Sequence, residues 1–204
     1  MPQGSNNRLG ATSTVRYTSV MAESAIPHRP ISVREYLDME EVATIRHEYV
    51  SGTIHAQAGT TKRHNRIALN IATRFASSAR GGPCRVYASD VKLRVSDDIF
   101  YYPDVMVARE PEGQDPIYED APCLVVEVVS PSTATIDRRE KLNAYRKVST
   151  LKSYLIVDQE NKQIERHWRD DDGLWWEAAL VGTGEIPIPC PETRLSLEEI
   201  YEGL

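Results

Sequence analysis

The chain has 204 residues and a mass of 23.0 kDa, which suits one domain with a short appendage. No stretch approaches the roughly 18 apolar residues that a membrane span needs, so we expect no membrane partner. The net charge of −6 argues against a uniformly basic nucleic-acid binder. The charge is uneven, however, because eight basic residues and one acid lie between residues 61 and 94. A basic face could still contact phosphates, although a solvated helix face explains the pattern equally well.

The ends of the chain and its cysteines limit the classes of protein and the cellular locations that we expect. Residues 1–25 contain no apolar block, so we expect a disordered tail and not a secretory signal, followed by one domain over residues 26–204. Met21 is a candidate for the true start. Cys84, Cys123 and Cys190 are widely spaced and form no Cys-x-x-Cys pattern. We therefore expect no disulfide framework, no zinc site and a cytoplasmic location.

The first half of the chain predicts a helix, a hairpin and a second helix. Ser32 is a suitable N-cap with Glu35 three residues further on, and Ser51-Gly52 is a turn signal between two short runs. The second helix has apolar residues at the spacing of one packed stripe. These elements span residues 31–38 (helix), 47–57 (hairpin) and 61–79 (helix).

The second half predicts strands with two more helices. A long helix follows the third strand, and an acidic, Pro-containing loop at 109–122 is expected to be exposed. The expected strands are 84–94 (broken or bent near residues 89–90), 100–108, 124–129 and 154–158, then a hairpin of 164–168 and 174–180. The expected helices are 130–148 and 197–201. The order indicates an α/β (α+β) domain with a mixed sheet flanked by helices and with added hairpins at both ends.

Two carboxylates in apolar strands are the most informative feature. Asp104 follows Pro103, which cannot donate a ladder hydrogen bond and so marks a strand edge or a bulge. Glu127 lies within a run that is otherwise apolar. A buried carboxylate is costly unless a cation or counter-charge receives it, so the pair predicts a cation site of the kind used in phosphate chemistry. A buried ion pair, for example with one of the arginines, is the structural alternative for Glu127.

Three further side chains could join this pair. A helical wheel places Lys141 in the middle of the stripe expected to face the sheet, although snorkelling to the helix edge is an alternative. His64 shares a face with the apolar stripe of its helix and could contact a phosphate or be packed. Glu48 could complete a metal shell or form an ion pair with Arg46.

Several common enzyme motifs are missing from the sequence. It contains no Gly-rich nucleotide motif, no P-loop and no Gly-x-Ser-x-Gly. Ser130 follows a strand as a nucleophile would, but Pro131 has no backbone N–H for an oxyanion hole. Nucleotide-fold and serine-hydrolase functions are therefore disfavoured.

Taken together, these motifs resemble the PD-(D/E)XK nuclease superfamily and, within it, the Uma2-like restriction endonucleases. The likeness covers most of residues 32–181. The stretches that carry it are 47–54, 63–67, 89–95, 102–107, 124–133, 137–145 and 154–158.

The sequence departs from the superfamily pattern at one position. That pattern has a lysine two residues after the glutamate, where this chain has Val129. The resemblance implies that the following helix supplies the lysine, which is Lys141, with Lys92 on a neighbouring strand as the rival.

The resemblance further implies an endodeoxyribonuclease with Asp104, Glu127 and Lys141 as catalytic residues. Mg²⁺ or Mn²⁺ would be held by Asp104, Glu127, the backbone carbonyl of Val128 and Glu48. DNA would be the partner, and a homodimer would supply a site for each strand. The candidate nucleic-acid contacts are Lys62, Arg63, His64, Arg66 and Lys92.

Two other functions stay open at this stage. The same fold could be a nucleic-acid- or protein-binding module without catalysis, as Val129 and the acidic net charge suggest. A glycosidase-like pair of carboxylates ranks last, because the aromatic residues that would stack on sugars are concentrated in the final hairpin.

Overall fold

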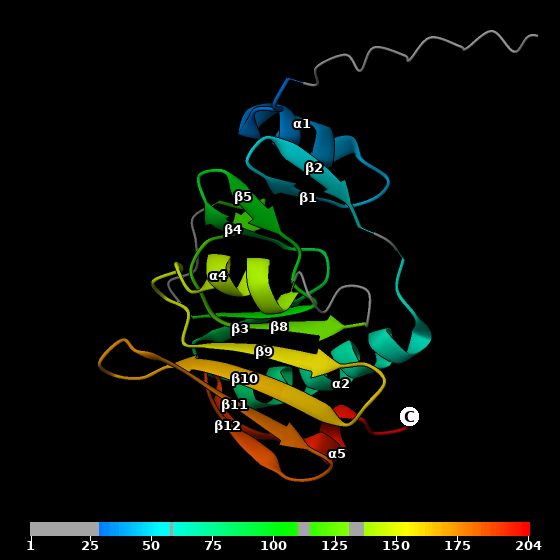
Figure 1. Ribbon diagram of the computed structural model, residues 1–204, viewed down its shortest axis with the longest axis vertical. Coiled ribbons are helices and arrows are strands. Elements are labelled where there is room, and N and C mark those ends of the chain that lie inside the picture. The colour runs from blue at the N-terminus through cyan, green and yellow to red at the C-terminus, as the bar shows by residue number, and fades with distance from the viewer. Residues whose placement is uncertain (1–28, 58, 110–114, 131–136) are drawn as a thin grey trace, which may run out of the picture.

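The computed structural model describes residues 29–57, 59–109, 115–130 and 137–204 and has a mixed α+β architecture (Figure 1). A smaller sheet, next to α1 (Val33–Val42), lies beside a larger sheet that has helices on both faces. This is the predicted fold class. The predicted tail and the candidate start at Met21 lie outside the described residues.

The smaller sheet contains the predicted N-terminal hairpin. Its strand order is β2-β1-β5-β4-β7. The strands are β1 (His47–Val50), β2 (Thr53–Ala56), β4 (Lys92–Ser96), β5 (Ile99–Tyr101) and β7 (Tyr118–Glu119). The hairpin turns at Ser51 and Gly52, which have φ values of 48° and 90°, as a two-residue turn of this kind requires. Helix α1 begins with the predicted capping box between Ser32 and Glu35.

The larger sheet has six strands in the order β11-β10-β9-β8-β6-β3. They are β3 (Cys84–Ala88), β6 (Val105–Arg109), β8 (Pro122–Val129), β9 (Ser153–Asp158), β10 (Gln163–Arg169) and β11 (Trp175–Val181). Strands β8 and β9 are parallel, whereas the other neighbours are antiparallel, so the sheet is mixed, as predicted.

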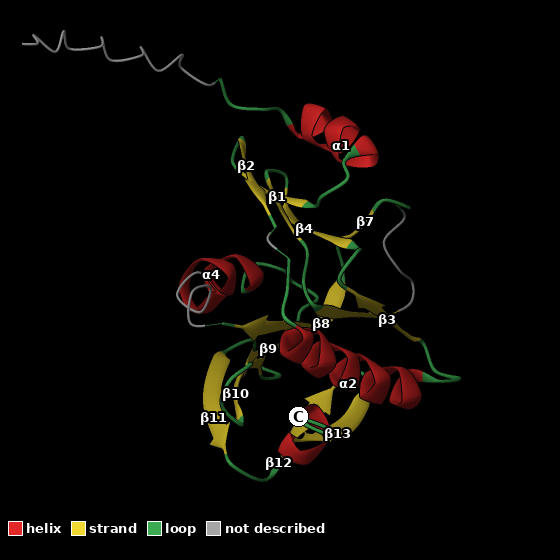
Figure 2. Cartoon of the chain, turned by 90° about the vertical axis from the view of Figure 1, so that its right-hand side faces the viewer, coloured by secondary structure: helices red, strands yellow, loops and turns green. Residues whose placement is uncertain are grey.

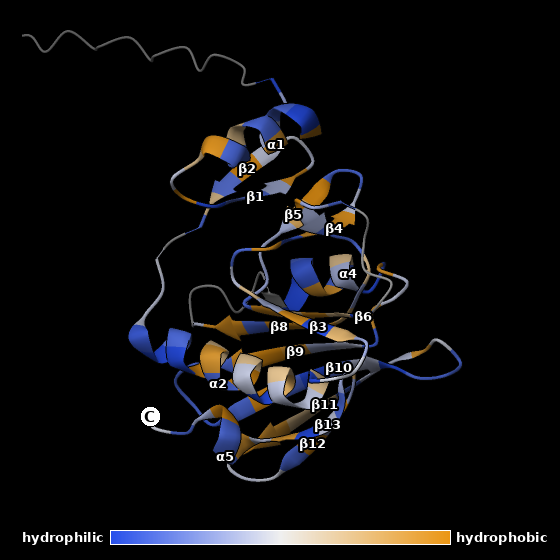
Figure 3. Cartoon of the chain, turned by 180° about the vertical axis from the view of Figure 1, so that it is seen from behind, coloured by the Kyte–Doolittle hydropathy of each residue, from blue (hydrophilic) through white to orange (hydrophobic). Residues whose placement is uncertain are grey.

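Helices cover the two faces of this sheet (Figure 2). On one face α2 (Lys62–Ala79) packs its stripe onto alternate residues of β6 and β8, such as Val107 and Val126. On the other face α4 (Leu142–Tyr145) packs onto the intervening residues, such as Val125. Strands β8 and β9 are hydrophobic, as expected for strands buried on both faces, and the first turn of α2 is hydrophilic (Figure 3).

Two of the predicted strands are each divided between the two sheets. Residues 84–94 form β3 and β4, and residues 100–108 form β5 and β6. The first break follows Ser89, which has φ of 58°. The second break is at Pro103-Asp104, where the missing proline N–H ends the ladder. Pro103 was expected to mark a strand edge or a bulge. In the structure it lies between β5 and β6, β6 is an inner strand, and Asp104 lies where the chain crosses between the sheets.

The helix after β8 and the acidic loop also differ from expectation. The described helical residues are a π-helical turn, η1 (Asp137–Lys141), followed by α4, whereas residues 131–136 lie outside the described part. The loop at 109–122 was expected to be exposed. Most of its described residues are exposed or partly exposed, as expected, but it contains β7, in which Glu119 is buried and accepts hydrogen bonds from the N–H groups of Asp120 and Ala121.

The C-terminal region adds a hairpin that the sequence did not predict, β12 (Glu185–Pro189) with β13 (Glu192–Ser196), before α5 (Leu197–Ile200). Cys190, between these strands, forms a disulfide with Cys123 on β8. The expectation of no disulfide is therefore wrong, because folding brings together cysteines that are 67 positions apart. Within the described ranges, no helix has the length and apolar character needed to cross a membrane.

Candidate active site

Asp104 lies immediately before β6, and its carboxylate contacts both β8 and α2. One carboxylate oxygen, Oδ2, accepts a hydrogen bond of 2.7 Å from the backbone N–H of Val128 on β8. The other, Oδ1, lies 2.8 Å from Nε2 of His64 on α2. The carboxylate is therefore fixed at the carboxyl end of β8. Since the N–H and C=O of one strand residue point to the same side, the carbonyl of Val128 also faces Asp104.

His64 reaches Asp104 because of how α2 begins. Thr61 caps the helix by accepting a hydrogen bond of 3.1 Å from the His64 N–H, which places His64 in the first turn. The histidine was predicted as a phosphate contact or a packed residue. In the structure it is a hydrogen-bond partner of Asp104, a pairing that no local sequence pattern indicates.

Glu127 is buried on the face of β8 that α4 covers, with 5% of its surface exposed. Its Oε1 atom lies 3.0 Å from Lys141 Nζ and accepts a hydrogen bond of 2.7 Å from the hydroxyl of Tyr145. Burial raises the pKa of Tyr145 well above its usual value, so the hydroxyl stays protonated and can donate. Glu127 thus forms a buried ion pair, the structural alternative that the sequence left open, and its partner is Lys141.

Lys141 is buried as the helical wheel predicted, with 7% of its surface exposed. It ends the π-helical turn, and its ammonium group lies 2.9 Å from Glu48 Oε1 as well as 3.0 Å from Glu127. It also lies over the ring of Tyr101, at 5.2 Å from the centroid. Burial raises the pKa of Tyr101 to about 12, so this ring is neutral at physiological pH. One lysine therefore joins two acidic residues from two different sheets.

Glu48, on β1, is the second acid that Lys141 contacts. Besides Lys141, it accepts weak hydrogen bonds from the N–H of Tyr102 at 3.4 Å and from the amide of Gln57 at 3.5 Å. The suggested pair with Arg46 is not formed, because Arg46 contacts Asp90 at 3.5 Å. Glu48 thereby connects the N-terminal hairpin to the site.

Lys92, the rival lysine, lies in a different environment. Its ammonium group is 5.5 Å from the centroid of the Tyr102 ring, and the hydroxyl of that tyrosine donates to buried Glu40 at 3.2 Å. Burial lowers the pKa of Lys92, because few groups compensate the desolvated charge. The structure therefore brings Lys141 to Glu127 and places Lys92 with Glu40 and Tyr102.

The basic residues at the start of α2 fall into two groups. Lys62 and Arg66 are exposed, next to the turn that carries His64. Arg63 instead donates hydrogen bonds to the carbonyls of Gln159 and Glu160, which attaches the start of α2 to the turn after β9. Only the first group presents its charge to solvent in this arrangement.

The donor set is compatible with a hard divalent cation. Asp104, Glu127, Glu48 and the Val128 carbonyl offer oxygen atoms, which Mg²⁺ and Mn²⁺ prefer. In the described part of the chain, no three acidic, histidine or cysteine side chains are grouped closely enough to form a metal cluster as they stand. Proteins usually hold Mg²⁺ through one or two carboxylates, with water and substrate phosphate as the other ligands.

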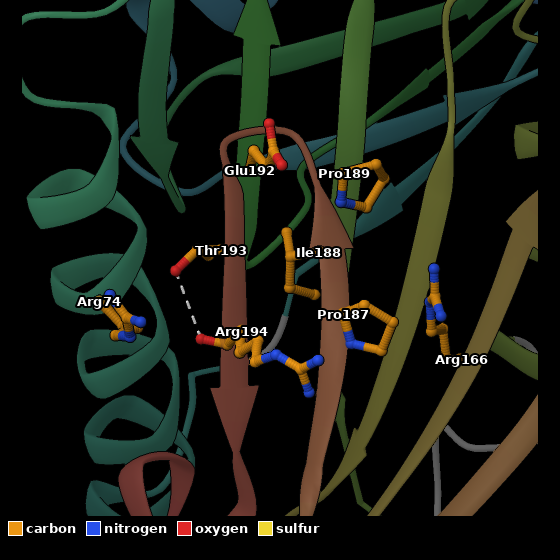
Figure 4. A pocket seen from close by; sticks show the side chains of 8 residues that line it. All are labelled: Arg74, Arg166, Pro187, Ile188, Pro189, Glu192, Thr193 and Arg194. Atoms are coloured by element: carbon orange, nitrogen blue, oxygen red, sulfur yellow. Dashed lines mark hydrogen bonds between the residues drawn. The ribbon is translucent and has the colours of Figure 1, made fainter.

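A broad depression of about 860 Å³ lies elsewhere, over the β12–β13 hairpin and between α2 and β10 (Figure 4). Its lining includes Arg74, Arg166 and Arg194, of which Arg74 contacts Glu199 and Arg194 contacts Glu185. None of the predicted site residues lines this depression. The candidate site is thus separate from it.

Comparisons with known proteins match most of the chain to one family model and to two relatives. A family model, Uma2, described as "Putative restriction endonuclease", matches residues 33–199. An uncharacterised protein of Synechocystis, slr1290, is 33% identical over 180 residues, which is 87% of this chain and 95% of that protein. A second Synechocystis protein, sll1609, is 32% identical over 156 residues, or 74% of this chain and 88% of the relative.

A solved structure shares the fold. The crystal structure of "a putative nuclease belonging to DUF820" from Anabaena variabilis superposes with a TM-score of 0.71 and 16% sequence identity. The match covers 84% of this chain and 98% of that chain. At this level of identity the likeness shows a common fold.

Proposed function

The chain belongs to the Uma2 family, and from this premise we propose that it is a metal-dependent endonuclease that hydrolyses DNA phosphodiester bonds at the Asp104–Glu127–Lys141 site. The observation that supports the proposal is the buried ion pair of Lys141 with Glu127 on β8, next to Val128, whose N–H donates to the carboxylate of Asp104. Burying such charges costs stability, which a role in catalysis would explain.

The proposed cofactor is Mg²⁺ or Mn²⁺, held by Asp104, Glu127, the Val128 carbonyl and Glu48. When bound, such an ion polarises a phosphoryl oxygen and makes a bound water more acidic. Lys141 has three donors on its ammonium group and would turn one toward the phosphate, where it would offset the charge that develops during attack.

Two other side chains would act by holding the carboxylates in place. His64 fixes the rotation of Asp104, because it contacts Oδ1 while Val128 N–H contacts Oδ2. Tyr145 fixes Glu127 through a hydrogen bond of 2.7 Å. Such supporting partners typically change metal affinity or activity by about 10- to 100-fold when removed.

Substrate binding is proposed to involve the exposed basic residues at the start of α2. Lys62 and Arg66 lie close in sequence to His64 and so to the candidate site. Contacts of this kind position the DNA backbone without reading its sequence. A homodimer, with one site for each strand, completes the proposal.

Plasmid nicking tests the proposed activity. Wild type is expected to nick supercoiled DNA with Mg²⁺ and not with EDTA, whereas Asp104→Ala and Glu127→Ala are expected to be inactive. Glu198→Gln, which changes an exposed acid, is the matched control. Equal nicking by wild type and both site variants would show a contaminating nuclease and would reject the assignment.

A second candidate function is a DNA-binding module that does not cut. The ion pairs of Lys141 with both Glu48 and Glu127 favour it, because these pairs already neutralise the acids that would attract a cation. This function predicts DNA binding without cleavage, together with a thermal midpoint that Mg²⁺ and Mn²⁺ leave unchanged.

A further inference from the structure

A cluster of three sulfur atoms lies away from the candidate active site. Cys123 on β8 and Cys190 between β12 and β13 form a disulfide, and Sγ of Cys84 on β3 lies 3.5 Å from Sγ of Cys190. Strand β6 separates β3 from β8, so Cys190 is the one sulfur that both strands can reach. Cys123 and Cys190 are buried, whereas Cys84 is partly exposed.

We propose that these three residues form a thiol–disulfide exchange site in which Cys84 is the attacking thiol and displaces Cys123 from Cys190. A thiol in contact with one sulfur of a disulfide is the arrangement from which exchange proceeds. The proposal goes beyond the nuclease site and does not depend on it.

The surroundings of Cys84 suit an attacking thiol. It lines a small surface depression of about 230 Å³ together with Arg80 and Arg85, both of which are exposed. The thiolate is the form of a cysteine that attacks a disulfide sulfur. Solvent access through the depression lets Cys84 release its proton to water.

The surroundings of Cys123 suit a leaving thiol. Its Sγ lies 3.3 Å from the carbonyl oxygen of Val107. While the disulfide is present, Cys123 has no S–H and cannot donate a hydrogen bond to this carbonyl. Once released and protonated, Cys123 can donate its S–H to that carbonyl. The buried product thiol would therefore be satisfied without rearrangement of β6 or β8.

The step is balanced without an external oxidant or reductant. The Cys84 thiolate attacks Sγ of Cys190, a new S–S bond forms, and the bond between Cys190 and Cys123 breaks. Cys123 leaves as a thiolate and takes up one proton, equal to the proton that Cys84 gave to solvent. One disulfide is present before and after the exchange. The exchange moves the attachment of the β12–β13 hairpin from β8 to the edge strand β3.

Disulfide mapping tests the proposal. Full-length protein purified without reductant is held in mildly alkaline buffer, quenched with acid, unfolded and labelled with a maleimide, then digested and analysed by mass spectrometry. In the wild type, the label is expected on both Cys84 and Cys123, and both Cys123–Cys190 and Cys84–Cys190 peptides are expected. Cys84→Ser is expected to lose all label on Cys123.

Cys123→Ser provides the complementary arm. In this variant Cys84 and Cys190 are expected to form a bridge, with loss of label from both. Wild type labelled on Cys84 alone, wild type with no bridge, or Cys123→Ser with two labelled thiols would each overturn the proposal. If Cys123→Ser does not fold, the comparison of wild type with Cys84→Ser still tests the proposal, because only wild type is expected to carry label on Cys123.

Discussion

The backbone N–H of Val128 donates a hydrogen bond of 2.7 Å to the carboxylate of Asp104. This bond extends the contact of β6 with β8 beyond the last ladder pair, Val105 with Val126. It takes the place of a strand hydrogen bond that the chain loses where it leaves the sheet at Pro103. The same bond sets Asp104 beside Val128, the residue that follows Glu127 in β8.

Asp104→Asn is expected to abolish stabilisation by metal. The amide keeps the size of the side chain but removes the charge that would attract the cation, so Mn²⁺ should raise the thermal unfolding midpoint of wild type and not that of the variant. Differential scanning fluorimetry at a series of Mn²⁺ concentrations measures this. Glu198→Gln is the control and should respond as wild type does; an equal response of Asp104→Asn would place the cation elsewhere.

Lys141→Met is expected to lower the nicking rate by about 100-fold or more, as removal of one charge-stabilising donor typically does. Lys92→Met is expected to stay within about threefold of wild type, because a residue away from the reacting groups supplies less than about 1 kcal/mol of the barrier change. Lys147→Met, an exposed lysine near the same helix, is the control for net charge. A larger loss in Lys92→Met than in Lys141→Met would assign the catalytic role to Lys92.

Local patterns predicted much of the fold and of the candidate site. The capping box of Ser32 and Glu35 depends on residues three apart, and the inward position of Lys141 depends on one helical period. Asp104 and Glu127 stood out because an acid in an apolar strand is costly wherever that strand lies. Each of these signals is contained within a few residues.

The features that were missed depend on contacts between distant residues. Nothing local shows that β3 and β4 join different sheets, because sheet membership is fixed by partners far along the chain. The disulfide joins cysteines that are 67 positions apart, and a hairpin that contains Pro187 and Pro189 resembles a loop in sequence. The bond from His64 to Asp104 likewise spans 40 positions.

His64→Ala is expected to lower nicking by about 10- to 100-fold, because Asp104 would lose one of its two fixed contacts. As a positioning residue, His64 should act mainly through metal affinity, so higher Mn²⁺ concentrations should restore part of the activity. His64→Gln, which can still donate to Asp104, should recover more activity than His64→Ala at equal metal concentration. A loss in His64→Ala that is independent of metal concentration would indicate direct contact with substrate instead.

Tyr145→Phe is expected to lower the free energy of unfolding by about 1–3 kcal/mol, since buried Glu127 would lose a hydrogen bond while the core volume stays constant. Urea denaturation followed by circular dichroism measures the change. Tyr118→Phe is the matched control, because its hydroxyl contacts Arg94 at 3.2 Å in a partly exposed position and should matter less. Equal effects of the two substitutions would argue against a special role for the Tyr145 hydroxyl.

His167 on β10 makes stability depend on pH in a defined direction. It is buried and stacks on Tyr154 with the ring centroids 6.0 Å apart. Burial lowers its pKa below 6.5, and the neighbouring charge of Glu177, whose Oε2 lies 3.5 Å from Nδ1, only partly opposes the effect. The unfolded chain therefore binds a proton near pH 6.5, while the folded chain does so only at lower pH. As the pH falls through this window, the unfolded state gains more from protonation, and the free energy of unfolding decreases.

His167→Phe keeps the stacked ring and removes the titration. The thermal midpoint of wild type is expected to fall more steeply between about pH 7 and pH 5 than that of the variant, because only wild type carries this buried histidine. Thermal unfolding of both proteins across that range, at constant ionic strength, gives the two slopes. His55→Phe, at an exposed histidine on β2, should keep the steeper slope of wild type. Parallel slopes for wild type and His167→Phe would show that other groups set the acid sensitivity of this fold.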